Sequence, residues 1–279
     1  MAEITAEAVR TVRDRTDLPM MDCKRALVES NGDIEKAIEI LKLKAKNVVD
    51  KTKDRATSEG RVLTLTAADG SAAVMIELQC ESAPVAKSDD FSFLADQIAK
   101  QFLNGPGAAS PEELMKQSCP DRAGTTLAAL REEAINKIRE NMVLRRILKV
   151  TGPVGGYSHH NGSLGVLLRV SGANATSEVI RDVAMHIAAL SPTVTLPGEL
   201  DPTLVAAEKE KLTAEAKASG KPDNVIEKIV TGRLKTFYQN NGVLVEQVFA
   251  KDETKTVAQA LSAAGLTAVG FTRWRLGQA

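Results

Sequence analysis

The chain has 279 residues, of which 43% are hydrophobic but only 3% aromatic, so it can bury a full core built mainly from aliphatic side chains. Its 36 basic residues balance 36 acidic ones, which gives no support for non-specific nucleic-acid binding, because that binding needs a basic excess. The three cysteines are widely spaced without a Cys-x-x-Cys motif, and no apolar run reaches the ~20 residues that cross a bilayer, so we expect reduced thiols and no membrane segment.

The N-terminal region, residues 1–52, predicts three short helices that form a binding module. The first covers 5–15, and Pro19 is expected in the first turn of the second, where its fixed φ is useful. Asp33 can cap the third helix. That helix has apolar residues at helical spacing: Ile34, Ala37, Ile38 and Leu41. The first thirty residues of the chain carry acidic side chains throughout and resemble neither a secretory signal nor a transit peptide, so we expect a cytoplasmic protein.

After a charged linker, 53–60, a pattern of hairpin and helix occurs twice. The first hairpin turns at Asp69-Gly70, and its second strand places four residues on one face: Val74, Ile76, Leu78 and Cys80. A helix near 126–142 and a strand near 144–150 follow. The second hairpin turns at Asn161-Gly162 and precedes a helix at 176–190. We therefore predict the α+β class, with two related subdomains, each an antiparallel sheet with helices on one face: 61–150 and 151–279.

Residues 201–237 interrupt the second subdomain with two highly charged helices that join at 219–222. A polar helical hairpin cannot bury much of its own surface, so we expect it to protrude and to offer a flank or a tip to a partner. A segment at 243–250, a helix at 256–263 and a strand at 267–276 complete the chain.

No pattern of catalytic residues is evident. The Gly220-Lys221 pair lacks the earlier Gly and the following Ser or Thr of a phosphate-binding loop. The three histidines lack the spacing of metal ligands, and no cysteine has a basic partner in the sequence. We expect no metal, no cofactor and no enzymatic activity; turnover that depends on Cys80 would point to an enzyme instead.

The segment "PMMDCKRAL" at 19–27 places two adjacent methionines at the start of a helix, with Lys24 one turn further on. If one methionine faces the core, the other points away, and an exposed methionine beside a lysine suits an adaptable docking surface. Partial packing of both methionines on the first helix is the alternative.

The stretch "VRDRTDLPMMDCKRALVESNGDIEKAIEIL" resembles the N-terminal module of the bacterial elongation factor Ts family, whose pattern there is L-R-x-x-T-G-x-x-M-M-D-C-K-x-A-L. Further matches follow in order, among them "ENMVLRRI", "GYSHHNGSLGVLL" and "SGKPDNVIEKIVTGRLKTF". The resemblance implies a guanine nucleotide exchange factor for the GTPase elongation factor Tu, with a ubiquitin-associated-type module, a core of two subdomains and a helical hairpin.

The resemblance also implies which residues contact the partner. Arg13, Met20, Met21 and Lys24 match the family residues that dock on the GTPase domain of elongation factor Tu. His159 matches a histidine in the Tyr-x-His hairpin of the family, which is implicated in the same contact.

One short segment departs from the family. Between strand and helix the family reads T-D-F-V, and its Asp and Phe reach towards the nucleotide site of the partner, where they disturb Mg²⁺ ligation and the phosphate-binding loop. Here the flanks match, but the segment reads Ser82, Ala83, Pro84 and Val85, so the carboxylate and the aromatic ring are absent. Pro84 could still stiffen this segment, which we call the knuckle, and present Val85.

Two functions therefore remain open at the level of the sequence. The protein either promotes GDP release from elongation factor Tu, mainly through its N-terminal module and the second half of the core, or holds the GTPase without efficient exchange. Faster release in the presence of the protein would distinguish the first from the second.

Overall fold

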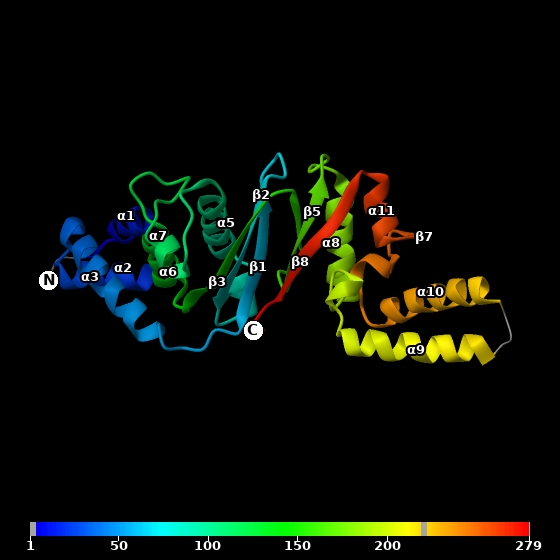
Figure 1. Ribbon diagram of the computed structural model, residues 1–279. Coiled ribbons are helices and arrows are strands. Elements are labelled where there is room, and N and C mark those ends of the chain that lie inside the picture. Colours follow the sequence, from blue (N-terminus) through cyan, green and yellow to red (C-terminus); the bar gives the residue numbers. More distant parts are fainter. Residues whose placement is uncertain (1–3, 219–221, 279) are drawn as a thin grey trace. The chain divides into compact units, whose positions relative to one another are not determined.

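A computed structural model describes residues 4–218 and 222–278 of the chain. Helices and antiparallel sheets are both present, which confirms the predicted α+β class (Figure 1). The chain divides into two compact units. Among the described residues, the first contains those of 1–63, 76–147 and 276–278, and the second contains those of 64–75 and 148–275.

Three helices open the first unit: α1 (Ala6–Thr16), α2 (Met20–Glu29) and α3 (Ile34–Thr52). The Thr5 hydroxyl accepts the Ala8 N–H at the start of α1, and the Asp33 carboxylate accepts the Lys36 N–H at the start of α3, as the sequence predicts for Asp33. One apolar cluster joins the three helices: Val9, Val12, Cys23, Ala26, Leu27, Ala37, Ile38 and Leu41.

The segment between α1 and α2 differs from the prediction in one respect. Pro19 does not lie in the first turn of α2 but immediately before it, as the N-cap residue, where its carbonyl accepts the N–H groups of Asp22 and Cys23. Asp17, at the position of the glycine in the family pattern, takes a left-handed conformation with φ 53°. That conformation explains why glycine suits the position.

The first sheet has the strand order β1 (Glu59–Thr66), β2 (Ala72–Cys80), β3 (Met142–Thr151). Because β2 is the central strand, it is buried on both faces, whereas its alternating pattern predicts only one buried face. The Glu77 carboxylate is 1% exposed and has partners on both oxygens. Arg146 Nε lies 2.7 Å from Oε2, while Gln79 Nε2 and the Gly277 N–H donate to Oε1 at 2.7 and 3.0 Å.

Four helices connect β2 to β3: α4 (Ala83–Ala86), α5 (Asp89–Asn104), α6 (Pro111–Met115) and α7 (Leu127–Ile138). The Ser88 hydroxyl caps α5 by accepting the Phe91 N–H. Helix α7 ends earlier than the predicted 126–142, because Arg139 adopts a left-handed conformation with φ 71° and its N–H bonds the Ile135 carbonyl at 2.7 Å.

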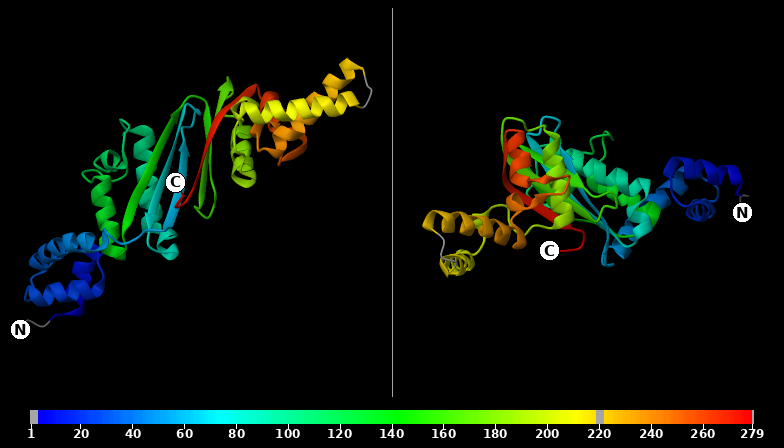
Figure 2. Two further views of the ribbon diagram at one scale, coloured as in Figure 1. Left: turned by 60° about the horizontal axis from the view of Figure 1, so that its bottom comes forward. Right: turned by 90° about the vertical axis from the view of Figure 1, so that its right-hand side faces the viewer.

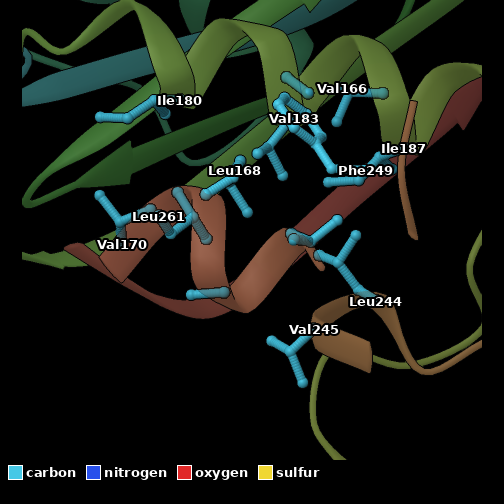
Figure 3. Packing of buried hydrophobic residues seen from close by; sticks show 14 of the residues in the cluster. Val166, Leu168, Val170, Ile180, Val183, Ile187, Leu244, Val245, Phe249 and Leu261 are labelled. Atoms are coloured by element: carbon cyan, nitrogen blue, oxygen red, sulfur yellow. The ribbon is translucent and has the colours of Figure 1, made fainter. Parts of the chain in front are cut away.

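The second unit contains the antiparallel sheet β4 (Val154–Ser158), β5 (Leu164–Gly172), β8 (Leu266–Arg275), with β5 in the centre. Helices α8 (Glu178–Leu190) and α11 (Val257–Ala263) pack with this sheet around one apolar core, in which Val166, Leu168, Val183 and Ile187 point toward one another (Figure 3). Two short elements add Leu244 and Phe249 to this core: η2 (Leu244–Glu246) and β6 (Val248–Phe249). The other short elements of this unit are η1 (Pro197–Glu199) and β7 (Asp252–Thr256).

The polar segment of the second unit forms two helices, α9 (Pro202–Ala218) and α10 (Asp223–Asn240), which lie side by side in Figure 1, while α9 lies in front of α10 in the left view of Figure 2. The predicted joint at 219–222 falls mostly outside the described residues. A small apolar cluster and the Arg233–Glu215 ion pair of 2.7 Å hold the helices together. The cluster contains Leu212, Ala216, Ile226 and Val230.

Candidate functional site

The outer face of α2 carries a group of exposed apolar and basic residues. Cys23, Ala26 and Leu27 point into the module core, so the positions between them turn outward. Met20 is 52% exposed and Met21 62% exposed, so of the two arrangements considered from the sequence, the one with a methionine buried in the core is not observed. Val28, 52% exposed, follows Met20 and Lys24 at intervals of four residues and extends the group; that spacing in the sequence could have identified it.

We call Arg13, Met20, Met21, Lys24 and Val28 the module surface; all five are exposed. Neither Arg13 nor Lys24 forms an ion pair with any residue in the described part of the chain. The neighbouring Asp22 carboxylate binds Arg25 and Arg139 instead. Two cations beside flexible thioethers therefore remain available for a partner.

The knuckle, residues 82–85, folds as the N-cap and first turns of α4. Ala83 and Pro84 are exposed, while Ser82 and Val85 are partly buried. The Ser82 hydroxyl does not cap α4. It donates instead to Glu140 Oε1 at 2.6 Å, and the Ser82 N–H donates to Glu140 Oε2 at 3.0 Å. The family resemblance gives no sign of this glutamate as a partner of the knuckle, although it lies in the matching stretch "ENMVLRRI".

The thiol of Cys80 contacts the knuckle. It is fully buried, and its Sγ donates to the Ser82 carbonyl at 3.3 Å. Burial raises the pKa of this thiol to about 11, which keeps it protonated at neutral pH. Such a thiol is a poor nucleophile, so the arrangement fits a structural cysteine.

His159 lies in the second unit, at the tip of the β4–β5 hairpin. Its Nδ1 is 2.8 Å from Asn161 Oδ1, which also accepts the N–H and the hydroxyl of Ser163. Because that oxygen is an acceptor, Nδ1 carries the proton, and in the neutral ring Nε2 is left as an acceptor. The His160 ring, at a centroid distance of 4.3 Å, and the Tyr157 ring, at 6.3 Å, flank it.

The rest of the described chain contains no group of three or more side chains that could hold a metal ion. His186 is buried, and both of its ring nitrogens are occupied, Nε2 by Gln247 Oε1 at 3.0 Å and Nδ1 by the Ala250 N–H at 3.2 Å. None of the helices in the described ranges has the length and apolar character of a membrane span. The candidate site residues thus lie in three places: the module surface, the knuckle and the His159 hairpin.

Comparison with known proteins gives consistent matches. A family model described as elongation factor TS matches residues 81–278. The chain is 42% identical to the elongation factor Ts of Hyphomonas neptunium, over 100% of this chain and 93% of the relative. It is 39% identical to that of Methylococcus capsulatus, over 99% of this chain and 92% of the relative, and 39% identical to that of Paenarthrobacter aurescens, over 99% and 100%.

Proposed function

Because this chain belongs to the elongation factor Ts family and is a guanine nucleotide exchange factor of elongation factor Tu, we propose that it speeds GDP release mainly through the module surface and the second half of the core. The observation that carries this proposal is the exposed pair Met20 and Met21 beside Lys24, which has no ion-pair partner among the described residues. In this proposal Arg13, Met20, Met21 and Lys24 dock on the GTPase domain, and His159 makes a further contact.

An exchange factor accelerates release because it binds the nucleotide-free GTPase more tightly than the nucleotide-bound one, and this coupling is reciprocal. Contacts that fit only the deformed nucleotide site supply the difference. At the knuckle, Ala83 and Pro84 have neither the charge nor the reach of the Asp and Phe in the family pattern. The knuckle here therefore acts as a short rigid projection that presents Pro84 and Val85, and the other contacts supply most of the differential binding.

The proposed layout follows the family. Residues 1–52 form a ubiquitin-associated-type module, 53–60 a linker, and 61–150 and 151–279 two related subdomains, with the hairpin 201–237 protruding as a partner-binding arm. The protein performs no covalent chemistry, takes no cofactor, makes no direct contact with nucleic acid and works in the cytoplasm, where translation takes place.

Stopped-flow release of fluorescent GDP from the elongation factor Tu of the same organism tests the proposal. The expected result is a release rate that rises with the concentration of this protein and saturates. Tight binding without faster release would support the alternative, a paralogue that holds the GTPase, and would overturn the proposed route of GDP release.

A further inference from the structure

The turn between α7 and β3, residues Arg139, Glu140 and Asn141, binds other segments of the first unit. We call these three residues the clasp. The left-handed Arg139 ends α7, so that Glu140 and Asn141 follow outside the helix. Glu140 holds the knuckle through the two Ser82 bonds described above.

Asn141 holds two further segments. Its Nδ2 donates to the Lys53 carbonyl at 3.1 Å and to the Arg55 carbonyl at 2.9 Å, in the stretch that leaves α3. Its N–H donates to Glu81 Oε1 at 2.6 Å, immediately before the knuckle. Asn141 is 4% exposed, so these bonds are shielded from water and each would be costly to leave unmade.

Arg55 closes the network. Its Nη1 is 3.4 Å from Glu81 Oε1 and donates to the Arg139 carbonyl at 3.2 Å. Seven hydrogen bonds, each with a side chain as donor or acceptor, thus connect the clasp, the segment that follows the module, and the chain from the end of β2 into the knuckle.

We propose that Glu140 and Asn141 are positioning residues for nucleotide exchange, which hold the knuckle in a fixed relation to the segment 53–55 that follows the docking module. A partner that binds the module surface then meets the knuckle at a set place. The free energy of docking can then deform the nucleotide site of the partner, because the knuckle does not move relative to residues 53–55 when the partner binds. This inference rests on the proposed exchange function and names the residues that couple docking to release.

The test compares Glu140→Gln and Asn141→Ser with the wild-type protein. Glu140→Gln keeps the size of the side chain but removes its negative charge, so the two charge-assisted bonds to Ser82 are replaced by weaker neutral ones. Three quantities are measured: the Kd for GDP-bound elongation factor Tu, the Kd for the nucleotide-free form, and the GDP release rate at saturating factor. Glu133→Gln is the matched control, since within the described residues the Glu133 carboxylate on α7 pairs with Arg122 alone, at 2.6 Å.

For both clasp variants we expect binding to nucleotide-free elongation factor Tu to weaken about tenfold and release at saturation to slow about tenfold, as the loss of a charge-assisted or buried hydrogen bond would produce. The Kd for the GDP-bound form should stay within about twofold of wild type, because docking by the module is intact. A loss of folded protein would change both Kd values by the same factor, so their ratio separates positioning from folding. If Asn141→Ser does not fold, Glu140→Gln alone decides.

Equal weakening of both Kd values, or no change in either, would overturn the role of the clasp while leaving the proposed function in place. A wild-type protein that does not accelerate GDP release at all would overturn the proposed function and the clasp with it. The control Glu133→Gln is expected to match wild type in all three measurements.

Discussion

The Glu140 carboxylate holds Ser82 through both of its oxygens, one bonded to the Ser82 hydroxyl at 2.6 Å and the other to its N–H at 3.0 Å. Both residues are partly buried, and the acceptor is charged, so each bond is of the stronger kind. We expect Ser82→Ala and Glu140→Gln each to lower the free energy of unfolding by about 1 kcal/mol.

A double-mutant cycle in urea checks this pair. The two changes should be non-additive by about 0.5–1 kcal/mol, because each removes part of the same interaction. Fully additive losses would show that the two side chains do not interact in solution.

Lys24→Ala should weaken the exchange effect more than Ala83→Gly. Lys24 is exposed and unpaired in the described part of the chain, so its truncation removes a cation available to the partner without breaking a contact within the protein. Ala83 is exposed and has only a methyl group to lose. We expect about 1–2 kcal/mol weaker binding for Lys24→Ala and almost none for Ala83→Gly, from titrations of the GDP release rate. Equal effects, or the reverse order, would contradict the division of labour between module and knuckle.

The second unit should become less stable as the pH is lowered, because of His186. Burial lowers the pKa of this histidine from its usual 6.5, and the bond to Gln247 only partly offsets the burial. As the pH falls below ~6.5, the unfolded chain therefore binds the proton before the folded chain does, which favours unfolding. The contribution of His186 to stability is full above that pH and decreases until the pH reaches the lower pKa of the folded state.

Urea midpoints at about pH 7.5 and about pH 5.5 measure the effect of His186. The difference between them should shrink in His186→Gln, whereas His160→Gln, at an exposed histidine, should keep it. An unchanged difference in His186→Gln would mean that other groups cause the pH dependence.

The thiol of Cys80 should be unreactive in the folded protein. Its pKa of about 11 and its burial leave little accessible thiolate, and Cys23 and Cys119 are buried as well. A colorimetric thiol reagent near pH 8 should therefore react slowly with the native chain and fast with all three thiols in denaturant. Fast reaction of one native thiol, lost in Cys80→Ser, would contradict the structural role of Cys80 and would favour the enzyme alternative.

Local patterns predicted the parts of the fold that depend on neighbours in the chain. The spacing of Ile34, Ala37, Ile38 and Leu41 predicted the buried side of α3, and the Asn161-Gly162 pair predicted the turn between β4 and β5, where Gly162 takes φ 76°. The position of Pro19 was one residue off, since N-cap and first-turn positions have similar preferences for proline and differ only in hydrogen bonding.

Features that depend on distant segments could not be predicted in this way. The polar residues Glu77 and Gln79 alternate with apolar ones, which indicates an exposed face, but neighbours on both sides of β2 bury them. Ser82 and Glu140 are 58 positions apart, so no local spacing relates them. The family resemblance predicted the docking residues, whereas the bonds of the clasp join segments far apart in the sequence and are seen only in the folded structure.

Restoring the wedge of the family should speed release. Ala83 and Pro84 are exposed, so Ala83→Asp with Pro84→Phe adds a carboxylate and an aromatic ring without crowding the interior, and the Glu140 bonds to Ser82 remain. Proline donates no backbone hydrogen bond, so its replacement breaks none. If the wedge adds differential binding of ~1–3 kcal/mol, the release rate at saturating factor should rise about tenfold. Pro84→Ala alone is the control, which separates the loss of the proline from the gain of the aromatic ring. A rate that stays at the wild-type value in the double variant would show that elongation factor Tu of this organism is opened without a wedge, through contacts outside the knuckle.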